Sequence, residues 1–178
     1  MRISLYTIAI ETFVPMLRAL SEILGKGAQY AITKNFDSAV LVNARLVPDM
    51  YPLVKQVQLA CDHAKDSTAR LMGQEPPRFE DNEQSLDQLK ARIVRTIDYL
   101  GRAPAAAFEG AEDREIKIPI PNNGAIEMNG FQFLRDWALP HFYFHVVTAY
   151  DILRHSGVEL GKRDYLSRVG VYVRQTAT

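Results

Sequence analysis

Two histidines, His141 and His145, lie one helical turn apart in an aromatic-rich segment of the chain. At about 100° per residue they fall about 40° apart on a helical wheel, in the same apolar sector as Leu134, Ala138 and Ile152. Imidazoles at positions i and i+4 can present two nitrogens to one divalent metal ion. The alternatives are core histidines that hydrogen bond to a tyrosine, an aspartate or a backbone carbonyl, and a proton-transfer site without a metal. We expect both rings in the middle of the apolar stripe, where an unpaired polar group costs about 1–3 kcal/mol.

Pro140 immediately precedes the first of these histidines. A proline inside a helix has no N–H to donate, so the carbonyl four residues earlier, that of Asp136, loses its helical partner. We expect this carbonyl to be a hydrogen-bond acceptor beside the histidine pair.

A third metal ligand is harder to assign, although a catalytic zinc ion usually has three protein ligands and an open position. The helix predicted over 49–72 offers Gln58 and Asp62, one turn apart on its flank, and these are the candidates for the third ligand. The same polar flank is also compatible with a solvated surface. His63 points away from the apolar face of this helix, so we interpret it as a surface residue. Cys61 points inward and is typical of a small buried hydrophobic residue.

Hydrophobic periodicity predicts an all-α protein with four long helices. We expect them over about 12–28, 49–72, 85–100 and 129–155, the first with a bend or cap near Pro15. Asp49, Ser85 and Asn129 are the expected N-caps of the later three, and Asp37 that of a short turn at 38–41.

Between the third and fourth helices, alternation over 115–120 and a Pro-Asn-Asn-Gly turn predict a small β-hairpin that returns over 125–128. The tail from 158 has no clear period. The long connections between the helices indicate a four-helix bundle that departs from a simple up-down order.

Composition excludes several classes of protein. The chain has 178 residues, is 47% hydrophobic and 24% charged, and balances 21 basic against 21 acidic side chains. We therefore expect one globular domain over 1–178, with its core at about 4–166 and a tail at 167–178. Zero net charge argues against nucleic-acid binding, and a single cysteine against a disulfide-stabilised protein. We find neither a membrane-spanning stretch nor a good signal peptide, and we expect a cytoplasmic protein that does not bind membranes.

Within this balance, the stretch 75–87 is acidic and the tail from Arg154 is basic. No glycine-rich phosphate loop, G-x-S-x-G motif or CxxC motif is present.

The chain resembles the DinB/YfiT-like superfamily, and more closely an uncharacterised bacterial branch of it that is known as a domain of unknown function. The resemblance rests on the predicted helices, the H-x-x-x-H of the fourth helix and its Leu153–Gly157 ending, and covers about 4–166. The segments that carry the closer match are Ala44–Met50, Gln56–Asp62, Phe79–Asp81, Gly110–Ile116, Leu139–His145 and Gly161–Leu166.

This resemblance implies an antiparallel DinB-type four-helix bundle, often a homodimer. It also implies a zinc or nickel ion held by three histidines, two of which match His141 and His145. The third lies on the second helix of the family, about four turns before its terminal glycine. That count ends near Gln58 or Leu59 and not at a histidine, so Gln58 or Asp62 would have to serve as the ligand.

Two functions remain open at this point. The first is a metal-dependent protein that acts on a small molecule, as a hydrolase or thiol transferase by analogy with the superfamily, with a divalent ion at His141 and His145. The alternative is a non-catalytic bundle with core histidines, either a small-molecule-binding protein or a dimeric interaction protein.

Overall fold

The computed structural model describes residues 4–122 and 124–174. Residues 1–3, 123 and 175–178 lie outside it. The start of the chain, one asparagine of the predicted hairpin turn and the end of the predicted tail therefore fall outside the described residues.

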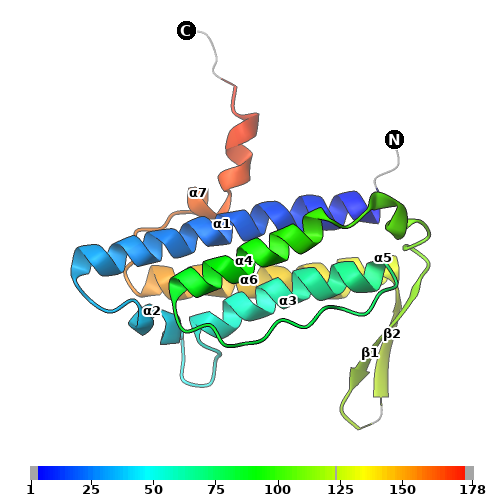
Figure 1. The fold of residues 1–178 in the computed structure, drawn as a ribbon, viewed down its shortest axis with the longest axis horizontal. Helices are drawn as coiled ribbons and strands as arrows, with labels where there is room; N and C mark the ends of the chain where they lie inside the picture. Colours follow the sequence, from blue (N-terminus) through cyan, green and yellow to red (C-terminus); the bar gives the residue numbers. More distant parts are fainter. Residues whose placement is uncertain (1–3, 123, 175–178) are drawn as a thin grey trace.

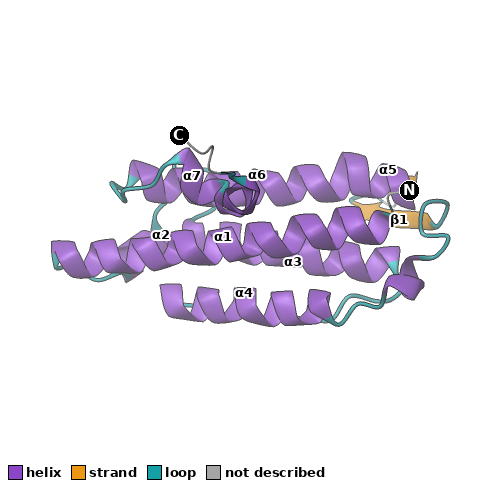
Figure 2. Cartoon of the chain, turned by 90° about the horizontal axis from the view of Figure 1, so that it is seen from above, coloured by secondary structure: helices purple, strands orange, loops and turns teal. Residues whose placement is uncertain are grey.

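Helices α1 (Leu5–Lys34), α3 (Leu53–Leu71), α4 (Leu86–Gly101) and α6 (Leu139–His155) lie side by side along the long axis of the molecule (Figures 1 and 2). Helices α1 and α3 each pack mainly against α4 and α6. Following the chain in Figure 1, α1 and α6 run in one direction and α3 and α4 in the other. The predicted fold class, a helical protein with a small inserted hairpin, is confirmed, and so is the departure from a simple up-down order.

The interior between these helices is apolar. Phe13 and Leu20 of α1, Val57 of α3, Leu89 of α4 and Phe142 of α6 have no exposed surface. The rings of Phe13 and Phe142 meet edge to face with their centroids 4.8 Å apart. Burying a side chain of this size stabilises the fold by about 1.5–3 kcal/mol, so this core holds the helices in place.

Helix α1 is longer at both ends than predicted. Ser4 caps it, its Oγ accepting from the N–H of Thr7 at 3.1 Å, and the helix runs unbroken through Pro15. Pro15 deprives the Glu11 carbonyl of its usual helical donor. The guanidinium of Arg168, near the C-terminus, donates to that carbonyl and, at 2.6 Å, to the Glu11 carboxylate. The proline therefore costs the helix less than its position suggests.

The other helix starts were predicted with mixed success. Asp37 accepts from the N–H of Ala39 at 2.9 Å, at the start of α2 (Ala39–Asn43). Ser85 accepts from the N–H of Gln88 at 3.2 Å and begins α4 where expected. The start at Asp49 is wrong, because α3 begins only after Pro52, whose extended backbone occupies the N-cap position.

A segment that we call the strap, residues 72–85, joins the end of α3 to the start of α4. It has no helix or strand, and it runs back along α3 and α4 between their ends (Figure 1). Because the strap returns the chain to the same end of the molecule, α3 and α4 can run parallel. It contains most of the acidic stretch noted in the sequence.

The hairpin and the C-terminal segment complete the described chain. Strand β1 (Glu115–Ile120) pairs antiparallel with β2 (Gly124–Asn129), as predicted. The tail is not irregular throughout, because α7 (Lys162–Tyr165) and the 3₁₀-helix η3 (Ser167–Tyr172) form there. Another 3₁₀-helix, η1 (Ala105–Phe108), lies between α4 and the hairpin. In Figure 1 the end of this segment projects away from the bundle. Among the described residues, no helix is both long and apolar enough to cross a membrane.

Candidate functional site

The predicted fourth helix is continuous from Gly130 to His155 but contains a π-helical stretch. It consists of α5 (Gly130–Gln132), the π-helical segment η2 (Phe133–Ala138) and α6. Asn129 begins it with a capping box: its side chain accepts from the N–H of Gln132, whose own side chain accepts from the N–H of Asn129. The expected N-cap is therefore confirmed. π-helical turns change which carbonyls have helical donors and occur often at functional sites.

His141 bonds to a carbonyl of this stretch. Its Nδ1 lies 2.8 Å from the backbone oxygen of Trp137, and its ring lies 4.3 Å from the Trp137 ring, centroid to centroid. A carbonyl acceptor is thus present as expected, but it belongs to Trp137, four residues before His141, and not to Asp136. A carbonyl oxygen can only accept, so Nδ1 of His141 carries a proton, and in the neutral ring the lone pair is on Nε2.

His145 is buried, with 8% of its surface exposed, whereas His141 is only half-buried. The expectation that both rings lie in the middle of the apolar stripe is right for His145 and wrong for His141, which lies at its edge. Nδ1 of His145 is 2.8 Å from Oε1 of Gln56, in the first turns of α3. The side chain of Gln56 therefore links α3 to the second histidine.

The structure adds a third histidine, His63 of α3, to this pair. Its ring centroid lies 4.7 Å from that of His141 and 5.3 Å from that of His145, with the ring planes inclined by only 25° and 13°. The interpretation of His63 as a surface residue is wrong, because the ring is half-buried between α3 and α6. The helical wheel of α3 placed its apolar face correctly, but α6 packs along the flank of that face.

Burial keeps two of these imidazoles neutral. Loss of solvent, together with the neighbouring His141 and His145, lowers the pKa of His63 to about 4. The same loss of solvent, together with His141, lowers the pKa of His145 to about 4. Near neutral pH both rings are uncharged, which is the protonation state in which histidine binds metals.

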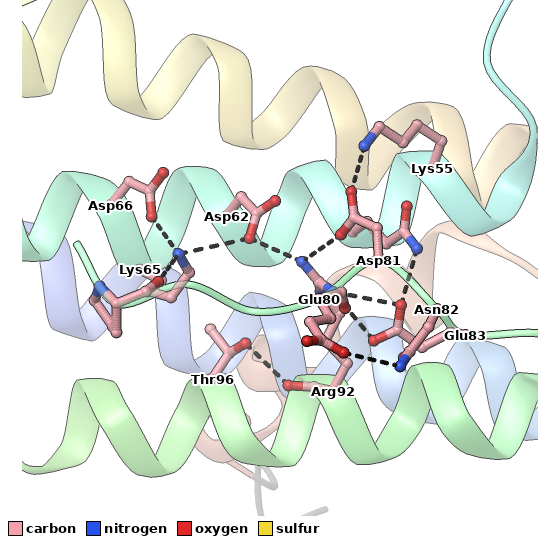
Figure 3. A network of polar contacts seen from close by, with 12 residues as sticks. Lys55, Asp62, Lys65, Asp66, Glu80, Asp81, Asn82, Glu83, Arg92 and Thr96 are labelled. Atoms are coloured by element: carbon pink, nitrogen blue, oxygen red, sulfur yellow. Dashed lines mark hydrogen bonds and ion pairs between the residues drawn. The ribbon is translucent and has the colours of Figure 1, made fainter.

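The expected third ligands, Gln58 and Asp62, are engaged elsewhere. Gln58 donates from Nε2 to Glu83 of the strap at 2.8 Å, and Asp62 accepts from Arg92 of α4 at 2.9 Å. Figure 3 shows Asp62 in the network of ion pairs around Arg92, between α3, α4 and the strap. Burial raises the pKa of Asp62 by more than the attraction of Arg92 and Lys65 lowers it. Arg92 and Glu83 thus hold these two side chains in the network between α3, α4 and the strap.

The three imidazoles fit a metal ion in kind and spacing, but not in orientation. Ligand nitrogens lie about 2.0–2.1 Å from a tetrahedral zinc ion, which places the ring centroids of two such ligands about 5 Å apart. The distances from His63 to the other two rings agree with this value. In the arrangement described, however, no three His, Cys, Asp or Glu side chains among residues 4–122 and 124–174 are placed to hold an ion. The reason is the stacking, because lone pairs in nearly parallel ring planes do not converge.

Of the three histidine rings, that of His63 is the one whose orientation is not fixed by a hydrogen bond to the described residues. It makes no side-chain hydrogen bond to the described residues, whereas His141 and His145 are each fixed by one. A turn of the His63 side chain about its own bonds would break no hydrogen bond to the described residues.

An exposed aromatic side chain lies beside the three histidines. Phe144 meets the ring of His145 edge to face at 5.2 Å, and 57% of its surface is exposed. Trp137 packs against the ring of His141 and is half-buried. The histidines therefore lie near the molecular surface with apolar neighbours.

Comparison with known proteins assigns a family to this arrangement. The family model "Domain of unknown function (DUF1993)" matches residues 5–166. The chain belongs to the DUF1993 family. The DUF1993 match spans the helices that carry all three histidines, the strap and the hairpin.

A solved structure is also similar to this DUF1993 protein. The crystal structure of a DinB family member protein from Shewanella denitrificans has 41% sequence identity and a TM-score of 0.85, and the match covers 91% of each chain. The resemblance to a DinB-like uncharacterised domain is therefore confirmed. Among curated proteins, none matches the chain.

Proposed function

We propose that this DUF1993 protein binds one divalent transition-metal ion, zinc or nickel, through His63, His141 and His145, and uses it to act on a small molecule. The observation that carries the proposal is the gathering of three imidazoles from two helices. Two of them have their Nδ1 protons bonded to acceptors, which leaves Nε2 for an ion. Such outer hydrogen bonds fix the tautomer and the ring orientation of metal-binding histidines.

The roles of the residues follow from their contacts. His141 and His145 would supply Nε2 from fixed rings, and His63 would supply the third nitrogen after its side chain turns. Trp137 and Phe144 would exclude water from one side and favour a substrate with an apolar part. When bound, a divalent ion in a site of three protein ligands supplies Lewis acidity at its open position. Hydrolysis or group transfer on a small molecule is the class of reaction that this chemistry supports.

One observation favours a second candidate, a non-catalytic bundle with a stack of neutral histidines. The nearly parallel rings and the lowered pKa of His63 and His145 are those expected if the imidazoles simply pack against each other. In that case the hydrogen bonds of His141 and His145 would serve only to satisfy buried polar atoms.

The two candidates are separated by metal binding. Protein produced without an affinity tag is stripped with a chelator and titrated calorimetrically with Zn²⁺ and with Ni²⁺. We expect one ion per chain in the wild type and a loss of at least tenfold in affinity for His63→Gln and His145→Gln. His155→Gln, which changes an exposed histidine at the end of α6, is the matched control and should bind as the wild type does. Equal affinity in all four proteins would leave the non-catalytic bundle.

A further inference from the structure

Gln56 is a polar residue that the bundle buries almost completely, with 1% of its surface exposed. Its amide group makes two contacts in opposite directions. Nε2 donates to the backbone oxygen of Tyr51 at 3.1 Å, and Oε1 lies 2.8 Å from Nδ1 of His145. The amide therefore bridges the loop before α3 and the middle of α6.

Elementary chemistry sets the direction of this bridge. The backbone oxygen of Tyr51 can only accept a hydrogen bond, so the part of the amide that faces it must be the NH₂ group. The part that faces His145 is then the amide oxygen, which also only accepts. Nδ1 of His145 must therefore carry the proton, and Nε2 bears the lone pair.

We infer that Gln56 is a positioning residue that holds His145 as the Nδ1–H tautomer and so presents Nε2 as the donor atom of the site. Its effect on metal affinity rests on the proposed metal centre, whereas its effect on the tautomer does not. Gln56 differs from the carboxylates that often support metal-binding histidines, because its amide is uncharged. Together with the Trp137 carbonyl, it orients the histidines without reducing the positive charge that an ion would bring.

The tautomer is measured by ¹⁵N NMR of the imidazole nitrogens in the full chain without metal. The wild type should show His145 protonated at Nδ1. Gln56→Leu, which removes the acceptor, should lose this preference. Gln56→Glu should keep it, because a carboxylate also accepts from Nδ1. Gln58→Leu is the matched control, since Gln58 is buried on the same helix but bonds to Glu83, and His145 should remain unchanged in it.

Metal affinity is measured in the same proteins by titration with Zn²⁺. Loss of a hydrogen bond to a metal-binding histidine typically weakens binding by about 10–100-fold. We expect this loss in Gln56→Leu, recovery to at least the wild-type affinity in Gln56→Glu, and little change in Gln58→Leu. A role in folding alone would not produce recovery by a carboxylate, because a glutamate cannot donate to the Tyr51 carbonyl.

The outcomes separate this inference from the proposed function. A wild-type His145 protonated at Nε2 would overturn the inference without any variant, even if Gln56→Leu fails to fold. The inference would also be overturned if the wild type binds zinc and Gln56→Leu leaves both the His145 tautomer and the zinc affinity unchanged. If the wild type binds no zinc but His145 carries its proton on Nδ1 only while Gln56 is present, the proposed metal centre fails and the positioning role of Gln56 stands.

Discussion

Replacing Arg92 is the substitution whose effect on stability the structure defines most fully. The side chain has no exposed surface, and its guanidinium reaches the carboxylates of Asp62 at 2.9 Å, Asp81 at 3.0 Å and Glu83 at 3.1 Å. It also donates to the carbonyl of Glu80 at 2.9 Å. Arg92 therefore joins α4, α3 and the strap at one point (Figure 3).

The magnitude follows from what Arg92→Met would leave behind. Removing one partner of a buried ion pair typically costs about 3–5 kcal/mol, because the remaining charge is buried without compensation. Here Glu83 is the carboxylate left in that state, since its side chain is only 8% exposed, while Asp62 and Asp81 reach water. One term opposes this: Nε of Arg92 is buried without a partner among the described residues, at a cost of about 1 kcal/mol that the substitution removes. The net loss should be about 2–4 kcal/mol.

Urea unfolding followed by circular dichroism measures this loss. For a chain of this size the melting temperature should fall by about 5–15 °C. Arg95→Ala is the control, because Arg95 lies one turn away, is exposed, and stacks on Phe79 with its guanidinium carbon 3.6 Å from the ring centroid. An exposed contact of this kind is worth about 0.5–1 kcal/mol. If Arg92→Met costs no more than Arg95→Ala, the ion pairs of Arg92 do not anchor the strap.

Three further predictions concern other parts of the fold. The pKa of His63 is lowered to about 4 in the folded protein, whereas the same imidazole in the unfolded chain takes up a proton below about pH 6.5. Metal-free protein should therefore lose stability as the pH falls from about 6.5 to 4, and acid titrations of His63→Gln should show a weaker dependence. Burial raises the pKa of Cys61 to about 12, so a thiol reagent at pH 8 should react with the native protein far more slowly than with protein in urea. A Cβ on Gly130 would lie 1.8 Å from the carbonyl oxygen of Ala111, so Gly130→Ala should lower the free energy of unfolding by more than about 2 kcal/mol. A Cβ on Gly25 would meet nothing within 4 Å, so Gly25→Ala should raise the free energy of unfolding by about 0.5–1 kcal/mol.

The histidine pair could be predicted because its signal is local. His141 and His145 are one turn apart on one helix, and Ser85 and Asn129 cap their helices through hydrogen bonds that span only three residues. The π-helical turn before Pro140 was not predicted. The acceptor of His141 is the Trp137 carbonyl and not the Asp136 carbonyl that the position of Pro140 suggested.

The third histidine was missed because the apolar face of α3 does not define all of its contacts. Residues near the centre of that face meet the core, but α6 packs along its flank, where His63 lies. A weaker signal was present: Gln56 and His63 are seven residues apart, two helical turns, and therefore share one face. Which neighbour that face would meet depends on the order of the helices, and no local pattern in the sequence specifies it.

The acidic stretch of the strap illustrates the same limit. The sequence showed only that this stretch is acidic, whereas in the structure Asp81 and Glu83 bind Lys55, Gln58 and Arg92 on the adjacent helices. These partners are 9 to 26 residues away in the chain. Pairings over such distances are set by the path of the chain rather than by local sequence.

The proposed site, in which three imidazoles from α3 and α6 hold one metal ion, is tested most directly by X-ray absorption spectroscopy of the zinc-loaded protein. We expect three imidazole nitrogens at about 2.0–2.1 Å from the zinc ion in the wild type. We expect two in His63→Gln and three in His155→Gln. A stripped wild-type protein that takes up no zinc, or a zinc ion with the same number of imidazole ligands in the wild type and in His63→Gln, would contradict it.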